Sequence, residues 1–200
     1  MNFDGGVSGK NFGASAAPTL KKLLIEISKK VNYPYTDQSL YDFWNNENEI
    51  EPRIGNLGGG SDHIAFYMHI GIPSLSGGAS GPNLYHSNYD SFNFYEKFVD
   101  PEFKMGPTIE HFTGLLTLTM ANAELIPYDV KRYPSDLRLH FNNASKKIMK
   151  YHRDFEGFKK TEKEIENLFS ISSKLSESIK NYLEQEKFSK KELKVLNQKL

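Results

Sequence analysis

The sequence contains no cysteine. Disulfide frameworks and thiolate zinc sites are therefore excluded, and any metal must be held by histidine, aspartate or glutamate side chains. Net charge is missing as well, because 25 lysine and arginine residues balance 25 aspartate and glutamate residues. A chain without net charge gives no electrostatic reason to expect nucleic acid or an anionic membrane as its partner.

Long apolar runs are absent too. No stretch approaches the roughly 18 consecutive apolar residues that a membrane-spanning helix needs, and the N-terminus lacks the basic and apolar regions of a signal peptide. With 38% hydrophobic and 25% charged residues, the composition is that of an ordinary globular protein. The 200 residues suffice for one large domain, or for one domain with an appendage.

Glycine, proline and charge are distributed unevenly along the chain. Up to Pro127 the sequence has 14 of its 15 glycines, eight of its nine prolines, and 8 Lys/Arg against 14 Asp/Glu. Beyond Pro127 the charge balance reverses, to 17 against 11. Glycine and proline mark turns and strand ends, whereas Lys/Glu/Leu-rich periodicity marks helices. We therefore expect two domains, residues 1–127 and 128–200.

The first part alternates strand and helix signals, which indicates an α/β fold. The glycine-rich run from Ser76 to Gly81 is expected to be a loop. The expected elements are, in order, a strand over residues 1–4, a helix from Pro18 to Val31, a short helix over residues 63–70, a strand over residues 72–75 and an apolar helix from Pro107 to Leu125.

The second part is expected to be helical, with a first helix over residues 135–153. Thr161 and Ser189 are each followed three residues later by glutamate, the spacing of a capping box at a helix start. Apolar residues, Leu168 and Leu175 among them, form a stripe between these two positions. Three helices with lysine-rich outer faces cannot bury all their apolar surface, so they must dock on the first part or on another chain.

Several short motifs carry most of the chemistry. They are the segments 60–63 (GSDH), 71–73 (GIP), 84–90 (LYHSNYD), 98–103 (FVDPEF) and 125–129 (LIPYD), together with Asp4 near the N-terminus. In this order and spacing they resemble the glutamate carboxypeptidase II and transferrin receptor branch of the di-zinc aminopeptidase family, over nearly the whole chain. The resemblance implies the C-terminal part of a zinc-peptidase α/β sandwich core over residues 1–127. A transferrin receptor-like helical dimerisation domain, truncated here, would follow over residues 128–200.

The resemblance also implies roles for individual residues. Asp4 and His86 match two ligands of one zinc ion, and Tyr85 matches the tyrosine whose hydroxyl steadies the tetrahedral intermediate. Gly60 and Ser61 match residues beside the substrate. The complete enzyme would use two zinc ions that bridge a water molecule, while a glutamate removes its proton.

Two carboxylates are expected beside the site rather than in it. Asp62 is interpreted as a helix cap or a buried hydrogen-bond partner. Asp90 either orients the metal-binding loop as an outer-shell group or stabilises its turn. His63 and His69 are six residues apart, which does not place them on one helical face, so both are interpreted as structural or surface residues.

The departures from the family pattern matter equally. Its second histidine, bridging aspartate, further carboxylate ligand and catalytic glutamate normally precede the strand that ends at Asp4. We therefore expect this chain alone to be inactive. Ser61 stands where glutamate-selective members place asparagine, and no arginine occurs between Arg53 and Arg132. Because a guanidinium grips carboxylates well, we expect weak selectivity for C-terminal glutamate.

Two alternatives stay open beside a zinc exopeptidase. One is a non-catalytic relative of the transferrin receptor type, and the other is an interaction module built on the C-terminal helices. The expected partners are a peptide substrate and a second copy of the chain, bound through those helices. The resemblance suggests an extracellular or lumenal domain with a membrane anchor, but this chain contains no such segment.

Overall fold

A computed structural model describes residues 1–45, 50–152, 157–184 and 189–200. The chain divides into two compact units, Met1–Pro127 and Tyr128–Leu200. Their identity as a catalytic and a dimerisation domain stays a prediction.

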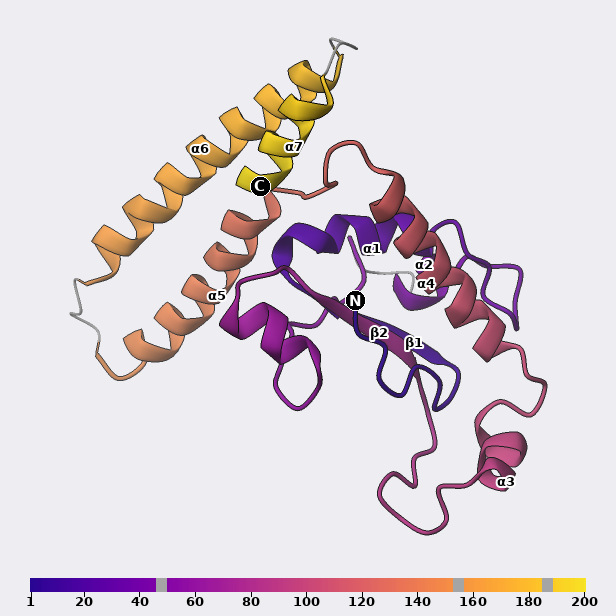
Figure 1. The fold of residues 1–200 in the computed structure, drawn as a ribbon. Helices are drawn as coiled ribbons and strands as arrows, with labels where there is room; N and C mark the ends of the chain where they lie inside the picture. The colour runs from indigo at the N-terminus through magenta and orange to yellow at the C-terminus, as the bar shows by residue number, and fades with distance from the viewer. Residues whose placement is uncertain (46–49, 153–156, 185–188) are drawn as a thin grey trace. The chain divides into compact units, whose positions relative to one another are not determined.

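The first unit contains a two-stranded antiparallel sheet of β1 (Asn11–Ala16) and β2 (Leu75–Ser80) (Figure 1). Phe12 lies opposite Ala79, and Ala16 lies opposite Leu75. These four side chains are all buried. Because successive side chains of a strand point to opposite faces, they share the face against which the helices pack.

The position of β2 corrects the sequence-based expectation. We expected a strand over residues 72–75 and a loop over 76–81, but the strand runs from Leu75 to Ser80. The glycines serve close backbone approach: a Cβ atom on Gly78 would lie 2.6 Å from the carbonyl oxygen of Gly6, and Gly78 has a φ of +155°. Only glycine fits such a position, so here a glycine-rich run forms a strand.

The strand expected over residues 1–4 is reduced to isolated contacts. Asn2 and Val7 form single parallel bridges with Ser76 and Ala79 of β2. The backbone N–H of Asn2 donates to the carbonyl of Leu75 at 2.9 Å. The N-terminal segment therefore runs alongside β2, which brings Asp4 near the loop that follows this strand.

Three helices pack against the buried face of the sheet: α1 (Lys21–Ser28), α2 (Leu40–Asn45) and α4 (Met105–Asn122). A 3₁₀ turn, η1 (Pro18–Leu20), opens the first of them. The ring of Phe12 meets Trp44 of α2 and Phe112 of α4 edge to face, with centroids 5.1 and 5.0 Å away. The largest fully buried side chains of this core include Leu24, Ile27, Leu40, Leu75, Met105, Phe112 and Leu116.

Short elements complete the first unit. The helix expected over residues 63–70 is a π-helical turn, η2 (Ala65–His69). A second such turn, η3 (Tyr95–Val99), follows the short α3 (Phe92–Phe94).

The second unit consists of α5 (Arg132–Met149), α6 (Phe158–Glu184) and α7 (Lys190–Lys199). The helix expected over residues 135–153 thus begins three residues earlier, at Arg132. Its expected last residue, 153, lies outside the described residues. Helices α5 and α6 meet through an edge-to-face pair, Phe141 and Phe158, and through Arg138, whose guanidinium lies 2.6 Å from Glu166. The same guanidinium lies 4.9 Å from the ring centroid of Phe169.

The two expected capping boxes have different outcomes. The box at Ser189 is confirmed, because its hydroxyl accepts from the N–H of Glu192 at 3.2 Å and the Glu192 carboxylate accepts from the N–H of Ser189 at 3.0 Å. The box at Thr161 is wrong, because α6 begins at Phe158 and places Thr161 inside the helix.

The fold class is confirmed in its coarser form. The described residues form many helices and one small sheet, and the second unit is helical. The sandwich core is not confirmed, because the sheet has two strands. None of the helices in the described ranges combines the length and the apolar character that crossing a membrane requires.

Candidate functional site

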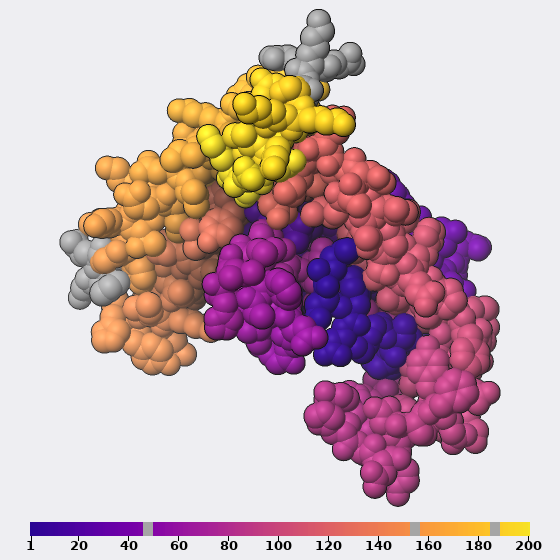
Figure 2. Space-filling view, in the orientation of Figure 1, coloured from indigo at the N-terminus to yellow at the C-terminus, as the bar shows by residue number. Residues whose placement is uncertain are grey.

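A cavity of about 310 Å³ lies between the N-terminal segment and the loop that follows β2. Asp4 lines it from the first of these, and Tyr85 and Asp90 from the second. Figure 2 shows the residues after β2, in magenta to pink, as a lobe that projects below the N-terminal residues in indigo. Three of the predicted site residues therefore share one cavity, although His86, Gly60 and Ser61 are not among the described lining residues.

A tight turn presents Tyr85 and His86. The carbonyl of Leu84 accepts from both the N–H and the hydroxyl of Ser87, at 3.1 and 2.7 Å. The side chain of Asn83 accepts from the N–H of Tyr85 at 2.7 Å. His86 adopts a φ of +62°, in the left-handed region that is uncommon for residues other than glycine. Such conformations often mark functional sites, where the surroundings impose them.

The two rings of this turn lie against each other. The Tyr85 and His86 ring centroids are 3.8 Å apart with an interplanar angle of 24°. Tyr85 is 69% exposed, and both residues belong to a fully exposed loop. A phenol ring and an imidazole ring are thus stacked on each other in an exposed loop that a ligand can reach.

Asp90 closes the same loop. Its backbone N–H donates to the carbonyl of Ser87 at 3.2 Å, and the residue lines the cavity together with Asp4. Both roles that the sequence left open for Asp90, loop orientation and turn formation, stay compatible with this placement.

A second turn, Gly58 to His63, approaches Asp4 from another side. Gly60 has a φ of +91°, which only glycine adopts easily. The His63 ring, 7% exposed, has Nε2 2.9 Å from the carbonyl of Gly58. The Ser61 hydroxyl donates to Oδ2 of Asp4 at 3.1 Å. Asp62 is exposed, so it is not the buried hydrogen-bond partner that was one of the two expectations for it.

Another cavity adjoins the first. It measures about 430 Å³ and shares Gly5 and Ser8 with the cavity of Asp4. The rest of its lining consists of small residues of both strands, Gly55 and one basic residue, Arg53. Arg53 is the last arginine before Ser61 in the sequence.

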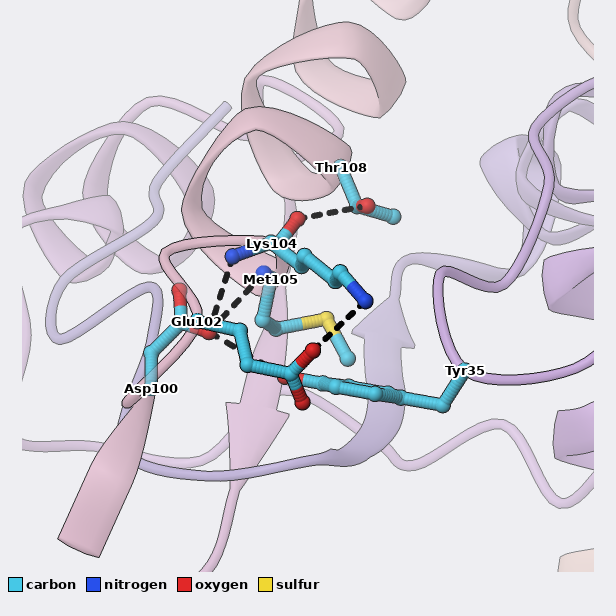
Figure 3. A network of polar contacts seen from close by, with 6 residues as sticks. All are labelled: Tyr35, Asp100, Glu102, Lys104, Met105 and Thr108. Atoms are coloured by element: carbon cyan, nitrogen blue, oxygen red, sulfur yellow. Dashed lines mark hydrogen bonds and ion pairs between the residues drawn. The ribbon is translucent and has the colours of Figure 1, made fainter.

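Sequence reasoning missed the role of Asp100, whose side chain is fully buried. Its Oδ1 accepts from the Tyr35 hydroxyl at 3.1 Å and from the N–H groups of Lys104 and Met105 at 3.0 and 3.2 Å (Figure 3). Its Oδ2 accepts from the N–H of Gly106 at 3.0 Å. These donors belong to the start of α4, so Asp100 caps that helix.

Electrostatics follow from this burial. Burial alone would raise the pKa of Asp100, but the N–H groups of Gly106, Met105 and Lys104 and the Tyr35 hydroxyl outweigh it, so the pKa is lowered. Burial, and then the Asp100 carboxylate, raise the pKa of Tyr35. Asp100 also accepts from the hydroxyl of Tyr95 at 3.4 Å. Since Tyr95 lines the cavity of Asp4, this network helps to form the cavity wall.

The predicted metal ligands do not by themselves make a zinc site. A carboxylate and an imidazole suit zinc chemically, but a catalytic zinc generally has three protein ligands. Among the residues with a described placement, no group of three histidine, aspartate or glutamate side chains is arranged to hold a metal ion.

Comparison with known proteins gives the family. No family model matches the chain. Over 157 residues it is 39% identical to a protein of Arthroderma benhamiae named "Probable glutamate carboxypeptidase", which covers 74% of this chain. Over 143 residues it is 36% identical to "Probable glutamate carboxypeptidase LAMP1" of Arabidopsis thaliana, which covers 69% of this chain. The chain belongs to the glutamate carboxypeptidase-like family.

The relatives of this glutamate carboxypeptidase-like chain also include proteins named as aminopeptidases. "Aminopeptidase NAALADL1" of Mus musculus is 26% identical over 152 residues, 68% of this chain. The resemblance seen in the motifs is thereby confirmed, and the family is one of peptidases. The chain spans about a fifth of the length of these relatives, 21% of the two glutamate carboxypeptidases and 20% of the aminopeptidase.

Proposed function

We propose that this chain contributes part of the active site of a zinc-dependent exopeptidase and does not hydrolyse peptides alone. One observation carries the proposal: Asp4 and Tyr85, far apart in sequence, line the same cavity of about 310 Å³. Membership of a peptidase family supports it. In the whole protein, further strands would extend the two-stranded sheet into the sandwich core.

The residues of this chain would divide the work as follows. Asp4 and His86 would be two of the ligands of a zinc ion that supplies an activated water when bound. The hydroxyl of Tyr85 would donate a hydrogen bond to the oxyanion of the tetrahedral intermediate, where a preorganised donor is worth most. The other ligands and the catalytic glutamate would come from residues outside this chain.

The cavity supports a broad substrate preference. Its described lining carries the carboxylates of Asp4 and Asp90 and no basic side chain. An acidic substrate side chain would meet repulsion there, since like charges at close range disfavour each other. We propose weak selectivity for C-terminal glutamate, with Arg53 of the neighbouring cavity as the basic group that any such selectivity would use.

A peptidase assay tests the proposal. With zinc chloride, the 200-residue chain is expected to release no product from dipeptides that end in glutamate, glutamine or leucine. The protein isolated from its source is expected to hydrolyse them, with kcat reduced about 10²- to 10³-fold in Tyr85→Phe because one oxyanion donor is lost. Hydrolysis by the 200-residue chain, or full activity of Tyr85→Phe, would contradict the proposal.

A second proposal concerns the helical unit, which we infer forms a homodimer contact. Large apolar side chains stay exposed on α6: Ile171 is 62%, Leu175 41% and Leu183 45% exposed. Exposed apolar surface of this kind marks association sites. A source protein that associates through these helices but hydrolyses no peptide would favour the alternative, a non-catalytic relative of the transferrin receptor type.

A further inference from the structure

The side chain of Ser61 is hydrogen-bonded to two residues of the N-terminal segment. Its hydroxyl lies 3.1 Å from Oδ2 of Asp4, and its oxygen lies 2.6 Å from Nδ2 of Asn2. Both partners come from the N-terminal segment, 57 and 59 positions away in sequence. The contact therefore ties the turn of Gly58 to His63 to the residues beside β2.

The direction of these hydrogen bonds is set by chemistry. The amide nitrogen of Asn2 can only donate, so it occupies the oxygen of Ser61 as an acceptor. The single proton of the Ser61 hydroxyl is then left for the carboxylate of Asp4, which can only accept when ionised. Asn2 thus orients Ser61, and Ser61 holds one carboxylate oxygen of Asp4.

The turn that carries Ser61 is built to hold this position. Buried His63 closes it through the carbonyl of Gly58, and Gly60 supplies the left-handed conformation. The N–H of Ile64 donates to the carbonyl of Ser61 at 3.1 Å. These contacts fix the backbone of Ser61 on both sides.

We infer that Ser61 is a positioning residue: it fixes the rotamer of the Asp4 carboxylate for the cavity. The inference deepens the proposed function and rests on it for the meaning of Asp4. Ligating carboxylates are commonly held by such outer hydrogen bonds, which orient them before anything binds. A hydrogen bond to a charged acceptor is strong enough to shift a rotamer ratio about tenfold.

The test measures the χ1 rotamer of Asp4 in the isotope-labelled 200-residue chain at neutral pH. Three-bond couplings from the Asp4 carboxyl carbon to its backbone nitrogen and carbonyl carbon report the populations. One dominant rotamer is expected in the wild type and in Ser61→Thr, which keeps the hydroxyl. In Ser61→Ala the ratio is expected to fall about tenfold toward averaging. An unchanged rotamer in Ser61→Ala would overturn the inference.

Two further variants separate positioning from general loosening. Asn2→Asp replaces the donor by an acceptor that competes for the Ser61 proton, so it is expected to release Asp4 as Ser61→Ala does. Thr113→Val removes a hydroxyl of α4 that donates to the backbone carbonyl of Glu110, and is expected to leave Asp4 unchanged. Amide spectra that match the wild type outside the turn confirm folding in each variant. Release of Asp4 in Thr113→Val would count against a specific role for Ser61.

The result is independent of the peptidase proposal. The rotamer of Asp4 is measured without metal or substrate, so a failed peptidase assay of the source protein does not alter it. Conversely, averaging of Asp4 already in the wild type would overturn the role of Ser61 and leave the proposed peptidase standing.

Discussion

The hydroxyl of Tyr35 donates to the buried carboxylate of Asp100 at 3.1 Å, across 65 positions of sequence. The same carboxylate caps the start of α4 through three backbone N–H groups. One side chain thus joins the segment after α1, the beginning of α4 and, through Tyr95, the wall of the candidate cavity.

Replacing Asp100 by asparagine is expected to lower the free energy of unfolding of the first unit by about 2–3 kcal/mol. The amide has nearly the same shape, but its NH₂ group would face donors and leave buried N–H groups without an acceptor. Urea unfolding followed by the fluorescence of Trp44, the single tryptophan, measures the change. Glu102→Gln is the control: it removes an exposed ion pair with Lys104, which contributes little to stability because solvent screens it.

The contribution of Asp100 is also expected to depend on pH. Its pKa is lowered in the folded state. The folded chain therefore binds fewer protons at this group than the unfolded chain does. The stabilisation is then fully present above the unfolded pKa of about 3.9 and is lost as pH falls through the folded value. Unfolding curves between pH 3 and 6 are expected to show the wild type and Asp100→Asn converging in acid; a constant difference would contradict this.

Ser189→Ala is expected to destabilise α7 locally by about 1 kcal/mol, because the N–H of Glu192 loses its acceptor. Faster hydrogen exchange of the α7 amides, about fivefold, would measure the loss. Thr161→Ala is the matched control, since the same sequence spacing there does not coincide with a helix start. Equal effects of the two substitutions would refute the distinction between them.

Ile171→Glu combined with Leu175→Glu is expected to abolish self-association without unfolding the helices. Both side chains are exposed and four residues apart, so they lie on one face of α6. Sedimentation velocity of the 200-residue chain reports the oligomeric state. Ser173→Glu adds one of these two negative charges at an exposed neighbouring position and is expected to leave the dimer intact. A wild-type monomer at all concentrations would refute the proposed contact.

Local signals predicted the helices well and the sheet poorly. Apolar periodicity located the region of α4, and the spacing of Ser189 and Glu192 located the start of α7. The strand β2 was missed because one of its glycines, Gly78, is required by the close approach of the Gly6 backbone, which lies elsewhere in the chain. Propensity describes single segments, whereas strand position depends on what packs alongside.

The site shows the same limit. The motifs indicated Asp4, Tyr85 and Asp90, and the structure places these three on one cavity. The environment of Asp100 depends on Tyr35, and that of Ser61 depends on Asn2, in each case a residue more than 50 positions away. No spacing within a motif carries that information. An aspartate five residues before α4 was the one available signal for the cap.

The most direct test of the central claim is a zinc titration of the 200-residue chain, followed by nuclear magnetic resonance of its side-chain carboxyl and imidazole groups. Asp4 and His86 are expected to shift together, weakly and saturably, because two ligands hold zinc poorly. His111, exposed on α4, serves as the internal control and is expected not to shift in step with them, and His86→Ala is expected to abolish the response of Asp4. Independent responses of Asp4 and His86, or a shift of His111 equal to theirs, would contradict a shared metal site.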